Sequence, residues 1–152
     1  MPTIQIHQAI GLTPEQYITG LTDFSPGRSK VFSHSADDYL EVHSLNRTEA
    51  DVTEGSGSVW ERLHYDWSDP RWVVVNTTAS NVWDTSSGYA YFFKALPDRR
   101  TYVHLTIVRV GKNTKGRLLA LALGTVAKGV LVKAFDNSVK ALEARNDGGP
   151  AR

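Results

Sequence analysis

A long amphipathic segment near the end of the chain, Lys115–Arg145, constrains the fold most. It contains no proline and is rich in Ala, Leu, Lys and Glu, which suit a helix. At about 100° per residue, apolar and small side chains from Leu123 onward collect on one side, opposite the charged ones. That side comprises Leu123, Ala127, Val130, Leu131, Ala134, Phe135, Ser138, Ala141 and Leu142. A single long helix of this kind must bury its apolar stripe against another layer of structure.

The preceding chain, from Asp37 to Val110, has the pattern of a sheet. Short β-prone segments alternate with turns that contain Gly, Pro, Asn or Asp, and Glu54-Gly55-Ser56-Gly57 is predicted to be one such turn. Because a parallel crossover takes about a dozen residues, connections this short indicate an antiparallel meander. The predicted strands are Tyr39–Leu45, Thr48–Thr53, Ser58–Trp67, Arg71–Ala79, Tyr89–Ala95 and Thr101–Val110.

The N-terminal part predicts one further strand and two short helices. Thr3–His7 alternates in the manner of a strand. Thr13 can cap a helix that has Pro14 at its first position and Gln16 at the capping-box offset, and this helix should run to about Phe24. A second, shorter helix is expected within Arg28–Ser33.

Length and composition describe a single domain. The chain has 152 residues, of which residues 1–145 are expected to form the domain and 146–152 a disordered tail. It contains no cysteine, which excludes disulfides, Cys-ligated zinc and thiol catalysis. The net charge of +1 argues against nucleic acid or an acidic membrane as partner, because phosphate binding needs a concentrated positive field.

Targeting and membrane signals are also lacking in the sequence. The N-terminus has neither the basic region nor the long apolar core of a signal peptide. The longest nearly uniform apolar run, Leu118–Gly124, is much shorter than a membrane span. We therefore expect a cytoplasmic protein without membrane insertion, a monomer or homodimer.

The order strand, two short helices, antiparallel meander and long helix resembles a known superfamily. The resemblance is carried by Gly55-Ser56-Gly57-Ser58-Val59-Trp60-Glu61-Arg62, by Tyr65-Asp66-Trp67-Ser68-Asp69-Pro70, and by Thr22-Asp23-Phe24 with Pro26. It is to the START-like or Bet v 1-like superfamily (SRPBCC), and within it to the bacterial polyketide cyclase/dehydrase and lipid-transport group. The resemblance implies an α+β helix-grip fold, in which a curved antiparallel sheet of about seven strands wraps around a long C-terminal helix. It also implies an elongated apolar cavity whose ligand is a lipid, sterol, polyketide or hormone, and only some members catalyse a reaction.

Aromatic residues are abundant in the central strands, where they either fill a core or line such a cavity. Tyr and Trp offer an apolar wall with a polar tip, which suits a hydrophobic ligand that carries a few oxygens. The predicted ligand-binding residues are Trp60, Arg62, His64, Trp72, Asn76, Tyr91, Leu131 and Phe135.

Strand alternation predicts which residues face inward in one strand but leaves two others open. In Thr101–Val110 the inward set is Val103, Leu105 and Ile107, which leaves His104 outside. In Ser58–Trp67 and Arg71–Ala79 both faces mix polar and apolar residues, so either face can point inward.

Catalytic residues cannot be assigned from these patterns. His64 lies close in sequence to Glu61 and Asp66 and could act in general acid–base chemistry, or it could be a hydrogen-bonded strand histidine. Arg62 could clamp a ligand or form a cross-strand ion pair. No histidine pair has metal-ligand spacing, and no cofactor is expected.

The sequence thus leaves two main functions open. The first is binding or transport of a small hydrophobic ligand between the sheet and the C-terminal helix, which requires an apolar cavity of roughly several hundred Å³ that opens near the second short helix. The alternative is an enzyme of the polyketide cyclase/dehydrase type that uses a polar residue in the same cavity. A partner-binding domain with a negligible cavity is a third possibility.

Overall fold

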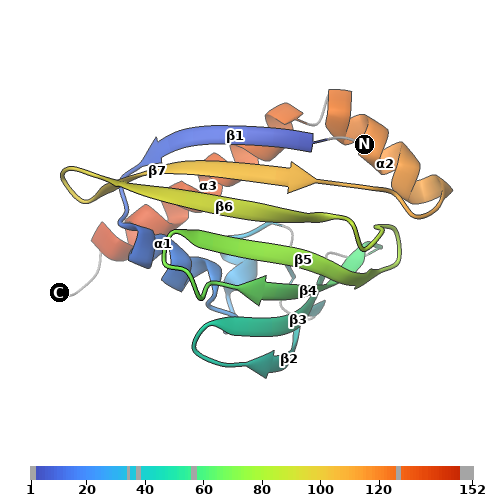
Figure 1. Cartoon of the computed structure of the whole chain (residues 1–152), viewed down its shortest axis with the longest axis horizontal. Coiled ribbons are helices and arrows are strands. Elements are labelled where there is room, and N and C mark those ends of the chain that lie inside the picture. Colours follow the sequence, from blue (N-terminus) through green and yellow to red (C-terminus); the bar gives the residue numbers. More distant parts are fainter. Residues whose placement is uncertain (1–2, 34, 37–38, 56–57, 126–127, 148–152) are drawn as a thin grey trace.

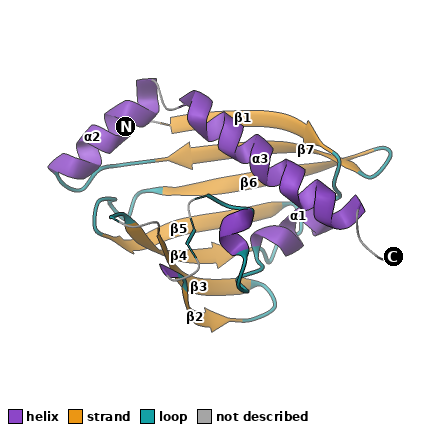
Figure 2. Cartoon of the chain, turned by 180° about the vertical axis from the view of Figure 1, so that it is seen from behind, coloured by secondary structure: helices purple, strands orange, loops and turns teal. Residues whose placement is uncertain are grey.

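A seven-stranded antiparallel sheet forms one layer of the molecule, and helices lie across one of its faces (Figures 1 and 2). The computed structural model describes residues 3–33, 35–36, 39–55, 58–125 and 128–147. The strands are β1 (Thr3–Ile10), β2 (Glu41–Leu45), β3 (Glu49–Gly55), β4 (Trp60–Asp66), β5 (Trp72–Ser80), β6 (Gly88–Leu96) and β7 (Arg100–Val108). The helices are α1 (Pro14–Leu21), α2 (Thr114–Thr125) and α3 (Lys128–Asp147), with a 3-10 turn η1 (Arg28–Lys30).

The sheet has the strand order β1-β7-β6-β5-β4-β3-β2. Strands β2 to β7 form the predicted meander, and β1 joins it at the edge by pairing with β7. In Figure 2, α1 and α3 cross the face of the sheet that is turned away from the viewer in Figure 1. The predicted helix-grip arrangement is therefore confirmed.

One predicted turn is wrong in its first half. Glu54 and Gly55 are the last residues of β3, where they pair with Glu61 and Trp60. Glu54 is buried and bonded to Arg28, which holds the strand to its end. Residues 56 and 57 lie outside the described residues.

Helix α1 begins as the sequence predicts. The Thr13 hydroxyl accepts a hydrogen bond from the Gln16 amide, and the Thr13 amide donates to the Gln16 side chain, which completes a capping box. The helix ends at Leu21, earlier than predicted, because the Thr22 hydroxyl bonds back to the Ile18 carbonyl and the chain then turns at Asp23.

The prediction of one continuous helix over Lys115–Arg145 is wrong. The segment forms α2 and α3, which are bent by 79° relative to each other, and each packs on a different part of the protein. Ala120 of α2 belongs to a small core with Val82 and Trp83, whereas Phe135 of α3 packs in the main core over the sheet. One straight helix could not pack against both cores, because they lie in different directions.

Among the described residues, the apolar stripe predicted for this segment is correct except at one exposed position, and Ala127 lies outside the described residues. Phe135, Ser138 and Leu142 are buried, but Val130 is 67% exposed. Helix α3 includes residues 146 and 147 of the predicted tail, and residues 148–152 lie outside the described residues.

The main core lies between α1, α3 and the concave face of the sheet, and it settles the two open strand registers. Leu63 and Tyr65 of β4 are buried, as are Val73 and Val75 of β5. The predicted inward set of β7 is confirmed for Val103 and Leu105, which are buried, and Ile107 packs against the same core, while His104 lies on the other face.

Polar bonds fix α3 over this core. The Ser138 hydroxyl donates to the Val31 carbonyl beside η1 at 2.7 Å. At the other side of the helix, Gln8 of β1 donates to Asp136 at 3.2 Å, and the Gly11 amide donates to Glu143 at 2.7 Å. These bonds determine where the inner face of α3 lies relative to β1 and η1.

Among the described residues, no single helix has both the length and the apolar character needed to cross a bilayer. The bent pair α2–α3 meets both criteria only when its two helices are taken together.

Candidate functional site

A pocket of about 140 Å³ lies between the inner faces of α2 and α3 and strands β6 and β7. Helix α1 and the residues after η1 complete its wall. Its lining is mainly aromatic and aliphatic. The lining residues are Tyr17, Phe32, Ser33, Tyr89, Tyr91, Leu105, Ile107, Arg109, Leu123, Leu131, Ala134, Phe135 and Ser138.

Packed rings form one wall of this pocket. The Tyr17 ring lies 5.6 Å from the Tyr91 ring and 6.1 Å from that of Phe135, so α1, β6 and α3 meet there. Burial raises the pKa of Tyr91 to about 12 and that of Tyr17 well above its ordinary value. Both hydroxyls are therefore protonated at neutral pH and act as hydrogen-bond donors.

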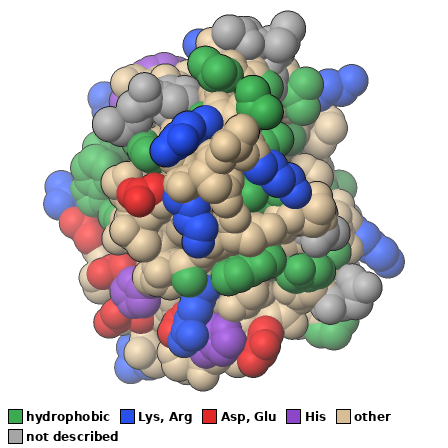
Figure 3. Space-filling model, turned by 90° about the vertical axis from the view of Figure 1, so that its right-hand side faces the viewer, with side chains coloured by type: hydrophobic (Ala, Val, Ile, Leu, Met, Phe, Trp, Pro, Cys, Tyr) green, Lys and Arg blue, Asp and Glu red, His purple; other side chains and the backbone are tan. Residues whose placement is uncertain are grey.

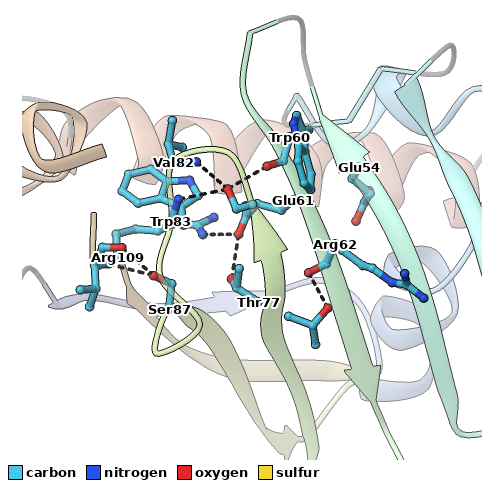
Figure 4. A network of polar contacts seen from close by, with 12 residues as sticks. Glu54, Trp60, Glu61, Arg62, Thr77, Val82, Trp83, Ser87 and Arg109 are labelled. Atoms are coloured by element: carbon cyan, nitrogen blue, oxygen red, sulfur yellow. Dashed lines mark hydrogen bonds and ion pairs between the residues drawn. The ribbon is translucent and has the colours of Figure 1, made fainter. Parts of the chain in front are cut away.

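A polar group closes the pocket beside α2 (Figure 4). Arg109 lines the pocket and donates to the Glu61 carboxylate at 2.6 Å. The same carboxylate oxygen accepts from the Thr77 hydroxyl at 2.8 Å, and the arginine lies over the rings of Trp83 and Tyr89 at 5.0 and 5.7 Å. The arginine that lines the pocket is thus held by Glu61 and the two rings, with its charge balanced.

A second, fully buried ion pair lies behind Phe32. Arg28 donates to Glu54 at 2.8 Å, and the exposures of the two side chains are 0% and 1%. Tyr65 donates to the same carboxylate, and the Arg28 guanidinium also bonds the Leu21 carbonyl. Burial alone would lower the pKa of Arg28, but Tyr65 and Glu54 raise it above its ordinary value. This cluster joins η1, β3 and β4 and positions the Phe32 wall, 4.7 Å from the guanidinium.

The pocket adjoins an outer groove between η1 and α3. The groove has a volume of about 380 Å³ and shares Ser33 and Ala134 with the pocket wall. Lys30 and Lys133 line it. The groove lies beside η1, the short helix near which a cavity was expected to open.

The predicted ligand-binding residues divide between the two faces of the sheet. Tyr91, Leu131 and Phe135 line the pocket. The other predicted residues do not line it, because each alternates with a buried neighbour on its strand and so projects from the convex face. These are Trp60, Arg62, His64, Trp72 and Asn76.

The convex-face residues have partners of their own. Arg62 forms a paired hydrogen bond with Asp51 of β3 at 2.9 and 2.8 Å, which is the cross-strand ion pair among the two alternatives. His64 contacts Glu49 at 2.9 Å. His64 thus lies on the convex face as a hydrogen-bonded strand histidine, the second of its two alternatives, and does not line the pocket. Glu61, by contrast, faces inward.

Sequence reasoning missed Arg109, although a signal was present. Arg109 continues the alternation of Leu105 and Ile107, the set correctly predicted to face inward. A charged residue that extends an inward-facing apolar row is a candidate for a pocket. Phe32 and Ser33 carry no comparable signal, because they follow a 3-10 turn whose direction only the tertiary structure fixes.

Across the described parts of the chain, no group of three or more His, Asp or Glu side chains is placed to hold a metal ion.

Comparison with known proteins identifies the fold through structure rather than sequence. The sequence matches no protein-family model and no curated protein. Solved structures that are similar include the Zhui aromatase/cyclase from a Streptomyces species, with a TM-score of 0.73 and 13% identity over 95% of this chain and 94% of that one. A START superfamily protein from Mycobacterium smegmatis has a TM-score of 0.69 and 10% identity, over 92% and 98% of the two chains. The Aha1 dimer from Colwellia psychrerythraea has a TM-score of 0.61 and 12% identity, over 95% of this chain and 96% of that one. At these identities the likeness establishes the fold alone.

Proposed function

We propose that this chain, which has the helix-grip fold of START-like proteins, binds a small and mostly apolar ligand in the pocket beneath α2 and α3. The observation that carries the proposal is the lining itself. Apolar and aromatic side chains from α1, α3, β6 and β7 surround a space of about 140 Å³, and few polar groups point into it. This is the composition of small-molecule sites in proteins, where apolar walls supply affinity and a few polar groups fix orientation.

The volume limits the size of the buried part of the ligand. At about 140 Å³ the pocket is smaller than the cavity expected from the sequence. Typical ligand pockets measure about 300–1,000 Å³, so this pocket would hold only part of such a molecule. The adjoining groove at Ser33 and Ala134 provides the remaining space. The ligand is therefore elongated, with an apolar end inside and a second end between η1 and α3.

The polar groups determine which functional groups the ligand carries. Because Glu61 already neutralises Arg109, the arginine suits an uncharged acceptor, such as a carbonyl or hydroxyl oxygen, better than an acid. At the entrance, Lys30 and Lys133 suit an acidic end. An acyl chain or a polyketide with a carboxylate combines these features.

A dye-displacement titration tests the proposal. The neutral apolar dye N-phenyl-1-naphthylamine is expected to fluoresce on binding and to be displaced by decanoate. Ala134→Trp places a large ring where pocket and groove meet, and Ile107→Trp fills the pocket from β7. Each should weaken dye binding by at least about tenfold, which corresponds to about 1.4 kcal/mol.

The matched control is Ala144→Trp, at an exposed position of α3. It adds the same ring to the same helix and should leave binding unchanged. Equal binding by the wild type and both pocket variants, with melting temperatures that show all proteins folded, would disprove a ligand in this pocket.

The enzyme alternative is favoured by a single observation. Glu61 faces the concave side and contacts Arg109, which lines the pocket, so a carboxylate lies one residue away from a bound ligand. If the chain is an enzyme, a copurified ligand changes mass during incubation in the wild type and not in Glu61→Gln. A binding protein returns the same ligand mass in both.

A further inference from the structure

The outer side of the helices that cover the pocket carries exposed aliphatic side chains. Leu118 and Leu121 of α2 are 63% and 66% exposed, and Val130, near the start of α3, is 67% exposed. Large aliphatic side chains gathered at this level of exposure on adjoining helices indicate a surface that is covered in use.

Basic side chains flank the two leucines. At about 100° per residue, Leu118 and Leu121 lie next to each other on α2, with Lys115 on one side of them and Arg117 on the other. The opposite side of the helix carries Ala120, which is buried against Trp83. Helix α2 therefore has an apolar outer strip bordered by positive charge, in addition to the side that packs on the core.

The charge of the whole segment has one sign. Between residues 111 and 135 the chain contains no Asp or Glu, and its basic residues are Lys112, Lys115, Arg117, Lys128 and Lys133. The net charge of +1, which by itself argued against an acidic membrane, is an average over the whole chain. The balancing acidic residues lie elsewhere, so this segment alone carries a concentrated positive charge. Figure 3 views the end of the molecule at which α2 lies, and hydrophobic and basic side chains mix over its upper part while acidic ones gather lower down.

We infer that this surface, formed by the outer face of α2 and the first turns of α3, docks on an anionic lipid bilayer. Aliphatic side chains enter the interface while Lys and Arg side chains contact acidic headgroups, as in other peripheral amphipathic helices. A second copy of the chain fits this surface less well, because a two-fold contact would bring two surfaces of the same positive charge together. The contact is peripheral and needs no membrane-spanning segment.

Membrane docking would serve the proposed ligand binding, and its role rests on that proposed function. Leu123 and Leu131 line the pocket from the same two helices, and Val130 and Lys133 line the groove at its entrance. A bilayer that contacts Leu118 and Val130 would thus lie against the cover and the mouth of the pocket. An apolar ligand could pass between pocket and membrane without crossing open water.

Vesicle sedimentation with the full chain tests the docking. The wild type should sediment with vesicles of equal parts phosphatidylcholine and phosphatidylglycerol, should stay in solution with phosphatidylcholine alone, and should be released at high salt. The variants Leu118→Ser with Leu121→Ser, and Arg117→Glu with Lys128→Glu, should each weaken sedimentation at least about tenfold. Both acidic substitutions fall in a first helical turn, where a negative charge suits the helix dipole and preserves the fold.

Two controls carry matched changes away from this surface. Val42→Ser with Leu45→Ser removes exposed aliphatic side chains from β2, at the far edge of the sheet. Arg99→Glu with Arg100→Glu makes the same change of net charge at the β6–β7 turn. Both controls should sediment like the wild type.

The docking is overturned if the wild type stays in solution with acidic vesicles or if the controls lose sedimentation to the same degree. It is also overturned if the surface variants instead abolish a dimer seen by sedimentation velocity without vesicles. Dye binding by the serine variant separates the two proposals, because it should persist when docking is lost. Ala134→Trp should lose dye binding but still sediment with vesicles, since it blocks the pocket and leaves the outer leucines in place.

Discussion

Arg28 and Glu54 are the most buried charges among the described residues, and each depends on the other. Their side chains are essentially inaccessible and lie 2.8 Å apart. We expect Glu54→Gln to lower the free energy of unfolding by about 3–5 kcal/mol, because it leaves a guanidinium charge without its counterion in the core. Urea denaturation of purified protein measures this loss.

A double variant separates the charge from the packing. Arg28→Met combined with Glu54→Leu removes both charges and should recover most of the lost stability. Asp51→Asn, which breaks the exposed pair with Arg62, should have a much smaller effect. A Glu54→Gln protein as stable as the wild type would show that the pair contributes little and that the Phe32 wall is held by other contacts.

At the scale of elements, two glycines should respond in opposite ways to the same substitution. A Cβ on Gly116 would lie 2.0 Å from the Val82 carbonyl oxygen. Gly116→Ala should therefore displace α2 and weaken its packing on Val82 and Trp83. A Cβ on Gly129 meets nothing within 4 Å, so Gly129→Ala should stabilise α3 by up to about 1 kcal/mol. Hydrogen exchange of the α2 and α3 amides distinguishes the two, and protection of α2 that is unchanged in Gly116→Ala would contradict the tight contact.

Three turns use one motif and give the protein a predictable acid response. Asp23, Asp66 and Asp84 each accept hydrogen bonds from a serine two residues later, and these bonds lower the pKa of each carboxyl. Because the folded-state pKa is the lower one, the stabilisation is fully present above the unfolded value of about 3.9 and is lost as the pH falls through the folded value. Denaturation midpoints should thus be steady from about pH 7 to 5 and fall below about pH 4.

The matched comparison uses asparagine, which keeps the turn but does not titrate. Asp66→Asn with Asp84→Asn should flatten the fall below pH 4. Asp98→Asn, at an exposed turn with a left-handed backbone that Asn also accepts, is the control. If Asp98→Asn flattens the loss of stability below pH 4 to the same degree, the Asp–Ser turns do not cause that loss.

In the C-terminal helices, the buried side could be predicted from the sequence but the bend could not. The apolar stripe correctly predicted Phe135, Ser138 and Leu142 as buried, because a helix on a sheet must bury one side. It could not show the bend between α2 and α3. The period continues through both helices, and only the placement of Val82 and Trp83 beside the sheet gives α2 its separate direction.

At the scale of the whole molecule, the order of elements was enough to predict the fold but not the site. Short turns force neighbouring strands to pair, so the meander followed from the sequence, as did the packing of a C-terminal helix against it. Which face of β4 and β5 points inward depends on how the sheet curves around α3. Trp72 and Asn76 were assigned to the ligand and project from the convex face, whereas Arg109, on a strand with a clear inward row, lines the pocket.

The central claim is that the pocket beneath α2 and α3 holds a ligand, and native mass spectrometry of protein purified from its own host tests it most directly. The account predicts a bound mass on the wild type that is lost on denaturation, yields an extractable apolar compound, and is missing from Ala134→Trp prepared in the same way. A wild-type protein that carries no added mass and binds no apolar dye, or an identical added mass on folded Ala134→Trp, would contradict it.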